Sequence, residues 1–241
     1  MQKVLLLLVV AGLLLLLAPT TTAPFDYYRF SFDFPGALCQ NRDCQADDLG
    51  NLSDFSINMH GFWPQMDTGS IDFCLYNGYD ESELSSDVLQ KMSENWVGTY
   101  NPTSGFRSHE WGKHGTCWAK QYYKNSSEFL KDDNYYELMN EYFALVMKIK
   151  TEAGLEDLFF SDRTSERMEF QLEDVMGLIQ GRFSVTGVEL ECEEINGEQY
   201  LTEARVCLDL EYNYIDCPNL IASCKPGTVI VQAYMTTLIK L

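Results

Sequence analysis

The stretch FDYYRFSFDFPG, residues 25–36, alternates aromatic with polar residues and ends in a proline and a glycine. This alternation is typical of a β-strand with one buried face, and the closing dipeptide predicts a turn. A second strand is predicted over residues 54–64, where DFSINMHGFWP also ends at a glycine and a proline. His60 would then lie at the exit of that strand, where functional side chains are often presented.

The rest of the chain supplies helices and a second pair of strands. Apolar residues recur at helical spacing over residues 82–96, 135–154 and 167–183. Strands are predicted over 185–194 and 199–210, on either side of an Asn-Gly turn. Helices in the middle of the chain and strands at both ends predict an α+β domain.

The first 23 residues have the pattern of a secretory signal peptide. Lys3 precedes an apolar run over residues 4–18, and small residues follow up to Ala23. The run is shorter than the about 20 residues of a membrane span, so no membrane anchor is expected. We expect residues 24–241 to form one exported domain, because that length suits a single full core.

Eight cysteines, an even number in an exported chain, predict four disulfides. No CxxC pair is present, which argues against a zinc ribbon. Asn51 and Asn125 begin N-x-S sequences and are predicted glycosylation sites.

The chain is strongly acidic, with 36 Asp and Glu against 17 Lys and Arg and a net charge of −19. A protein that holds nucleic acid stably normally carries a basic face, because neutralised phosphates supply most of the affinity. Composition alone therefore argues against a nucleic-acid partner, and only a specific local motif can outweigh it.

Such a motif is SHEWGKHGTCW, residues 108–118, which holds two of the three histidines. A helix capped by Ser108 would place five side chains on one side and turn Trp111 into the core. The five are His109, Glu110, Lys113, His114 and Cys117.

Three simpler interpretations of this motif are disfavoured. A zinc protease needs HExxH, whereas the second histidine here is one residue late and a lysine occupies the expected position, so no metal is expected. A nucleophilic Cys117 would need a free thiolate in an exported chain. An ordinary polar helix face does not account for three histidines in two short segments. Two imidazoles that exchange protons, with a lysine and a third imidazole to bind an oxyanion, suit attack at phosphorus.

HGFWP at 60–64 and HEWGKHGTCW at 109–118 resemble the two active-site segments of the ribonuclease T2 family, in particular its plant S-like members. The resemblance extends over nearly all of the chain after the predicted signal peptide. It implies a single disulfide-stapled α+β domain with a central, mostly antiparallel sheet packed against several helices. It also implies metal-independent cleavage of single-stranded RNA through 2′,3′-cyclic phosphates to 3′-phosphate ends, with no cofactor.

The resemblance further implies a role for particular residues. His60 and His114 would be the acid/base pair, His109 would contact phosphate, Glu110 and Lys113 would stabilise the pentacovalent phosphorane, and Trp63 and Phe106 would stack on bases. The implied disulfides are Cys39 with Cys44, Cys74 with Cys117, Cys192 with Cys224, and Cys207 with Cys217.

Three positions depart from the family pattern. Asp33 replaces a glutamine associated with recognition of the second base, Arg107 stands in place of a tryptophan, and Phe62 in place of a leucine. Asp33 could accept a hydrogen bond from a base amino group. Alternatively, Asp33 and Arg107 are exposed and have no specific role.

Together these observations predict a monomeric enzyme that is secreted or carried to the vacuole. It would have no membrane contact and no action on DNA, which lacks the 2′-hydroxyl. The alternative is a catalytically weak or inactive relative that serves in storage or defence, a hypothesis motivated by the acidic charge and the altered positions.

Overall fold

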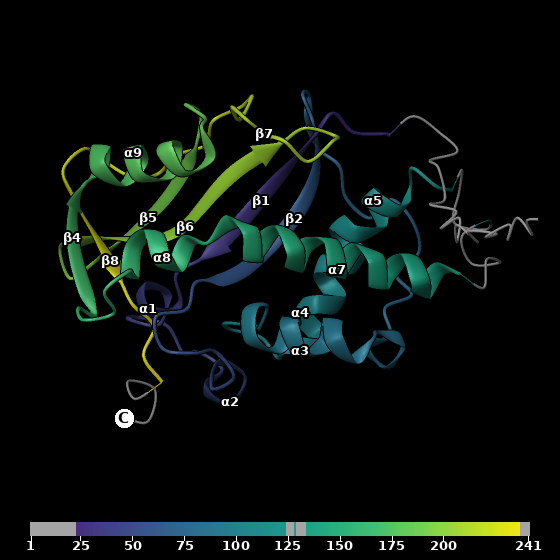
Figure 1. Ribbon diagram of the computed structural model, residues 1–241, viewed down its shortest axis with the longest axis horizontal. Helices are drawn as coiled ribbons and strands as arrows, with labels where there is room; N and C mark the ends of the chain where they lie inside the picture. The colour runs from purple at the N-terminus through teal and green to yellow at the C-terminus, as the bar shows by residue number, and fades with distance from the viewer. Residues whose placement is uncertain (1–22, 124–127, 129–133, 237–241) are drawn as a thin grey trace, which may run out of the picture.

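The computed structural model describes residues 23–123, 128 and 134–236, and the described residues form a mixed sheet with helices (Figure 1). The strand order is β3-β2-β1-β6-β8-β4, with β5 and β7 also paired to β6. All pairings are antiparallel except β6 with β8. The strands are β1 (Tyr27–Asp33), β2 (Asn58–Met66), β3 (Gly69–Ser70), β4 (Arg167–Gln171), β5 (Glu189–Ile195), β6 (Glu198–Leu208), β7 (Tyr214–Ile215) and β8 (Thr228–Gln232). The predicted α+β class is confirmed.

The long helix α7 crosses the sheet, with α3 and α4 beside it and α9 at the end where β4 lies (Figure 1). The helices are α1 (Pro35–Leu38), α2 (Ala46–Leu49), η1 (Glu81–Glu83), α3 (Ser86–Asn95), α4 (Thr103–Glu110), η2 (Trp111–Gly115), α5 (Thr116–Ala119), α7 (Tyr135–Ala153), α8 (Leu155–Phe160) and α9 (Leu172–Phe183). Among the described helices, none is long and apolar enough to cross a membrane.

Aromatic side chains from the sheet and from α7 fill the core. Phe30 and Phe32 of β1 are fully buried, as are Tyr142 and Phe143 of α7. The Tyr142 hydroxyl donates a hydrogen bond of 2.7 Å to the backbone carbonyl of Phe62 on β2. Because this contact fixes α7 against β2, the core also fixes the strand that carries His60.

Two boundary predictions are wrong. Residues 167–171 form β4, which pairs with β8, and the helix begins only at Leu172. Met168 and Phe170 alternate with polar residues, a period of two that the helical interpretation overlooked. The turn predicted after β1 is instead the short helix α1, with Pro35 at its first position, where a missing N–H costs nothing.

Other predictions from the sequence are confirmed. Asn196 and Gly197 both have positive φ, 54° and 84°, in the turn between β5 and β6. Gly154 ends α7 in the left-handed conformation. All four disulfides are present with the implied pairing, Cys39–Cys44, Cys74–Cys117, Cys192–Cys224 and Cys207–Cys217.

Two predicted features fall partly or wholly outside the described residues. The leader, residues 1–23, has only Ala23 described, and the sequon at Asn125 is not described. Asn51 is exposed just after α2 and is therefore accessible to a glycan. The leader and both glycosylation sites stay predictions.

Candidate active site

His60 occupies a β-bulge within β2. Ser31 of β1 pairs with Gly61 and the next residue, Phe32, pairs with Met59, so His60 is the surplus residue between them. A bulge re-aims a side chain that regular pairing would place elsewhere. Met59 and Phe62 point into the core, whereas the His60 side chain joins the polar face of the sheet.

The prediction that β2 ends at Gly61 and Pro64, with His60 at its exit, is wrong. The strand continues to Met66, and Pro64 lies within it opposite Tyr28. Beyond β1, the second neighbour of β2 is β3, which pairs only with Gln65 and Met66. Pro64 is thus at a sheet edge, where its missing N–H leaves no hydrogen bond unmade.

The second motif also begins differently from the prediction. Helix α4 starts at Thr103, whose N–H donates a hydrogen bond of 2.8 Å to the carboxylate of Asp48, so Ser108 is not the cap. Residues 111–115 then form a π-helical segment, a distortion frequent at functional sites. Ideal α-helical angles therefore do not hold over this motif, although Trp111 is buried in the core as predicted.

Trp63 packs against both histidines of the predicted acid/base pair. Its ring centroid is 5.0 Å from that of His60 and 5.2 Å from that of His114. The indole Nε1 donates a hydrogen bond of 2.8 Å to Oε2 of Glu110. The hydrogen bond to Glu110 therefore fixes the indole, and both imidazoles pack against it.

Gly61 is required for this arrangement. A Cβ at this position would lie well inside 3.0 Å of both Trp63 Nε1 and Glu110 Oε2. We expect Gly61→Ala to displace the indole and to lower the free energy of unfolding by about 1–3 kcal/mol, measured by urea denaturation. Gly105→Ala is the matched control, because nothing lies within 4 Å of its new methyl group. Equal stability of the two variants would contradict the role of Gly61.

Seven residues predicted from the sequence for the site line one cleft of about 380 Å³: His60, Trp63, Phe106, His109, Glu110, Lys113 and His114. A second cavity of about 360 Å³ adjoins it and shares His60, Asn101 and Phe106 as a wall. The phosphate of a ligand in the first cleft could thus be flanked by groups in both hollows.

The surroundings of His60 and His114 shift the pKa values of these two residues in opposite directions. Burial would lower the pKa of His60, but Asp33 and Glu203 outweigh burial and raise that pKa well above 6.5. His114 is only 5% exposed, and burial, followed by the charges of Lys113 and His109, lowers its pKa to about 2. Near neutral pH, His60 is thus a charged proton donor and His114 a neutral proton acceptor.

The pKa values of Glu110 and His109 also differ from their ordinary values. Burial raises the pKa of Glu110 to about 7, although nearby His60 and the hydrogen bond from Trp63 oppose the rise. His109 is exposed, and partial burial together with the charge of Lys113 lowers its pKa. Glu110 therefore changes charge near neutral pH, inside the cleft.

Asp33 and Arg107 are both buried, so the interpretation of them as an exposed pair without a role is wrong. Asp33 contacts His60. The Arg107 guanidinium pairs with Glu81 at 2.5 Å, and its Nε donates a hydrogen bond to the carbonyl of Trp96. Trp96 in turn donates from its indole to the carbonyl of His60, at 3.0 Å. Arg107 thus supports the backbone of the first motif.

In the described part of the chain, one group of donor atoms is close enough together to hold a metal ion, although none was expected. Oxygens of Asp33 and Glu203 and a nitrogen of His60 lie within 4.8 Å of one another. The same Glu203 oxygen, Oε1, already accepts hydrogen bonds from Ser31 and from Arg205. Because a cation occupies that oxygen, we assign no metal to this group.

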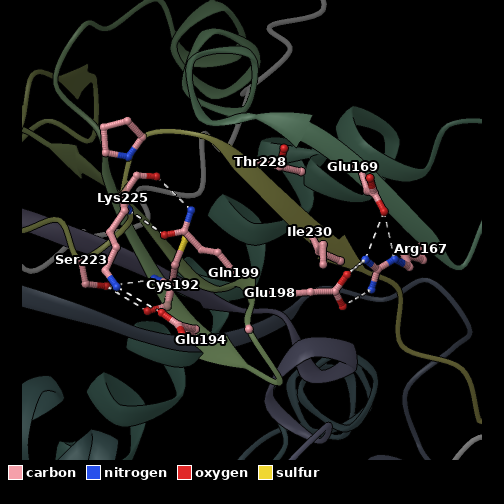
Figure 2. A pocket seen from close by; sticks show the side chains of 12 residues that line it. Arg167, Glu169, Cys192, Glu194, Glu198, Gln199, Ser223, Lys225, Thr228 and Ile230 are labelled. Atoms are coloured by element: carbon pink, nitrogen blue, oxygen red, sulfur yellow. Dashed lines mark hydrogen bonds and ion pairs between the residues drawn. The ribbon is translucent and has the colours of Figure 1, made fainter.

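A third cavity, of about 370 Å³, lies between the β5–β6 hairpin and β8 (Figure 2). Its charged groups pair with one another: Arg167 with Glu169 and Glu198, and Lys225 with Glu194. The described residues that line it include no histidine. It offers neither an acid/base pair nor an unpaired cation for a phosphate, and in this it differs from the His60 cleft.

Sequence reasoning missed Glu203 and Arg205. Both lie on β6, and Arg205 Nε donates a hydrogen bond of 2.7 Å to Glu203. The alternation of charged residues with Ala204 was a signal that they share one face of a strand. Nothing in the sequence indicated that this face meets His60.

Comparison with known proteins gives one consistent result. The family model of the ribonuclease T2 family matches residues 25–217. Extracellular ribonuclease LE of Solanum lycopersicum is 27% identical over 216 residues, covering 86% of each chain. Intracellular ribonuclease LX of the same species is 27% identical over 227 residues, covering 90% of this chain and 87% of that one.

Solved structures share the fold. Ribonuclease MC1 from the seeds of bitter gourd has a TM-score of 0.65 at 20% identity, covering 85% of this chain and 99% of that one. RNase NT, solved in complex with 5′-AMP, has a TM-score of 0.67 at 24% identity, covering 84% and 95%. The family model spans most of the chain and both histidine motifs, and the chain belongs to the ribonuclease T2 family.

Proposed function

We propose that this protein is an exported, metal-independent endoribonuclease that cleaves single-stranded RNA. The observation that carries the proposal is the pair of imidazoles that line one cleft next to Trp63, in surroundings that shift their pKa values in opposite directions. Efficient proton transfer needs one group that holds a proton and one that accepts it at the same pH.

In the proposed reaction, His114 removes the proton of the ribose 2′-hydroxyl. The 2′-oxygen attacks phosphorus, and the bond from phosphorus to the 5′-oxygen breaks. His60 gives its proton to that leaving oxygen. The product is a 2′,3′-cyclic phosphate, which water then opens to a 3′-phosphate with the two histidines in reversed roles.

The remaining cleft residues have supporting roles in this proposal. Lys113 and neutral Glu110 face the charge that grows on the phosphorane oxygens, and exposed His109 contacts the phosphate. Phe106 provides an apolar wall shared by the two cavities, on which a base can stack. Trp63 has less freedom to stack, because Glu110 and both imidazoles already hold it.

One relative is named an extracellular ribonuclease and another an intracellular ribonuclease. Both names fit a chain that enters the secretory pathway and is then secreted or retained in a vacuole. The four disulfides support the same route, because an oxidising compartment is needed to form them. The acidic net charge suits a monomeric processing enzyme that binds RNA briefly, since a net charge of −19 repels the product.

A single 2′-deoxy nucleotide tests the chemistry. We expect an oligoribonucleotide with one 2′-deoxy residue to be cut everywhere except on the 3′ side of that residue, because the nucleophile is missing there. Products can be resolved by gel and by mass, where the cyclic phosphate is 18 Da, roughly one water, lighter than the 3′-phosphate. EDTA should leave the rate unchanged. Cleavage at the deoxy position, or restoration of a chelated enzyme by zinc, would assign a different mechanism. No cleavage of RNA by the oxidised protein would favour the inactive storage or defence alternative.

The rate should depend on pH through Glu110. The raised pKa, about 7, means that Glu110 is protonated below that pH and gains a negative charge above it, next to the phosphate. Because His60 stays charged and His114 neutral on both sides, kcat/KM should be highest below neutrality and fall as pH rises through 7. Glu110→Gln should remove this fall. A Gln variant with an unchanged decline would show that another group titrates.

A further inference from the structure

His60 contacts two carboxylates through the same ring nitrogen. Its Nδ1 lies 3.2 Å from Oε1 of Glu203 and 3.3 Å from Oδ1 of Asp33. Both carboxylates are about nine-tenths buried, whereas the histidine side chain is 32% exposed. Nε2, on the opposite edge of the ring, is therefore the nitrogen left for a ligand in the cleft.

The pairing of the strands creates this contact. Asp33 of β1 is directly opposite Glu203 of β6, and Glu203 is opposite Glu191 of β5, so three acids form a row across the sheet. The bulge in β2 adds His60 at the end of the row. Two like charges opposite each other are unfavourable unless a cation lies between them.

Arg205 keeps Glu203 ionised. Its guanidinium contacts Glu203 and Glu191, each at 2.7 Å, and Glu189 at 3.5 Å. Burial alone would raise the pKa of Glu203. His60 and Arg205 outweigh burial and lower that pKa to about 2. Burial raises the pKa of Asp33, although His60 and Arg205 oppose the rise. Glu203 is thus the permanent anion, and Asp33 is the second carboxylate that contacts His60.

The other charges that face His60 come from α4 and η2. Lys113 brings positive charge, His109 and His114 would add to it only when protonated, and Glu110 is buried in the same cleft. A positive charge at any of these positions opposes a proton on His60, so the carboxylate pair is what favours it. The aromatic rings of Trp63 and Phe106, at centroid distances of 5.0 and 6.1 Å, restrict the ring from two further directions.

From this geometry we propose that Asp33 and Glu203 are positioning residues that keep His60 protonated and aim its Nε2 at the leaving oxygen. The proposal rests on the proposed function, which supplies the reaction. It assigns to Asp33 a role in proton donation in place of base recognition. In the proposed step the His60 proton goes to the leaving oxygen as the P–O bond breaks, and Glu203 remains ionised throughout.

The first test measures His60 directly and needs no activity. We expect NMR titration of the full oxidised protein to give His60 a pKa clearly above 6.5. Asp33→Asn and Glu203→Gln should each lower that pKa by about 1–3 units, and the double variant by more, since each removes a neighbouring opposite charge. Glu191→Gln is the matched control, because Glu191 lies in the same row and pairs with Arg205, whereas His60 pairs with Asp33 and Glu203. A His60 pKa that is unchanged in the double variant would overturn the proposal.

The second test separates proton donation from base binding. The substrates are uridine 3′-methyl phosphate and uridine 3′-(4-nitrophenyl phosphate), which both lack a second base. Their leaving groups are methoxide and 4-nitrophenolate, and only methoxide needs a proton to leave. The Asp33→Asn/Glu203→Gln variant should lose roughly 10²-fold in kcat/KM on the methyl ester and little on the nitrophenyl ester. Equal losses on both esters would indicate a merely structural role and contradict the proposal. If the wild-type protein cleaves neither ester, the proposed function fails, while the titration still decides whether the carboxylates hold the proton.

Discussion

His114→Ala should lower kcat/KM on RNA by roughly 10²–10⁴-fold while the fold is retained, because it removes the proposed proton acceptor for the 2′-hydroxyl. His60→Ala should have an effect of the same order, because it removes the proposed donor for the leaving oxygen. Steady-state kinetics on a short oligoribonucleotide, with circular dichroism as the check on folding, would measure both.

The two substitutions should not act independently. We expect the double variant to lose far less than the product of the two single losses, since groups that work as a unit are strongly non-additive. His109→Asn is the comparison variant, because His109 is exposed and proposed to contact only phosphate, so KM should change more than kcat. A His114→Ala enzyme that keeps half of the wild-type rate would refute the assignment.

Removing the Cys74–Cys117 disulfide should destabilise the domain by about 4 kcal/mol, from loop entropy alone. The bond closes a loop with a sequence separation of 43, and buried Cys117 lies two residues after the π-helical segment that carries Lys113 and His114. In the same region, the Phe73 N–H donates a hydrogen bond to the carbonyl of Lys113, at 2.9 Å. The double Cys→Ala variant should therefore lose activity at a lower temperature, as calorimetry and thermal inactivation can measure together.

The Cys39–Cys44 bond provides the control for this experiment. Its sequence separation is only 5, so loop entropy predicts about 2 kcal/mol for its removal. It also lies outside the His60 cleft. Equal losses of stability from the two double variants would show that loop length does not govern the effect.

The sequence predicted the members of the site better than their geometry. Four cleft residues lie within six positions of one another, so local spacing brings them together whatever the exact helix type. The π-helical segment was not predictable from apolar periodicity. Within it Gly115 packs closely on the Trp111 ring, since a Cβ there would lie well inside 3.0 Å of Trp111.

Long-range pairing accounts for what the sequence did not predict. Asp33 and Glu203 are 170 positions apart, and only the register of β1 against β6 places them opposite each other. His60 reaches them because of one surplus residue in β2, and the sign of a bulge in HGFWP is Gly61, since a glycine inside a strand often marks one. Residues 167–171 were predicted as helix for a related reason, since their strand state depends on pairing with β8, about 60 residues further along the chain.

The bulge at His60 makes the β1–β2 pairing less regular, and the proposed activity needs it. Deleting this single residue would let Ser31 and Phe32 continue an unbroken ladder with β2, in which every backbone group of the pair has a regular partner. The smoother sheet would lack the proton donor and would leave two buried acids facing each other without a cation at that end of the row. Selection for a more regular sheet and selection for catalysis therefore pull this position in opposite directions, and the surplus residue persists only while the chemistry is needed.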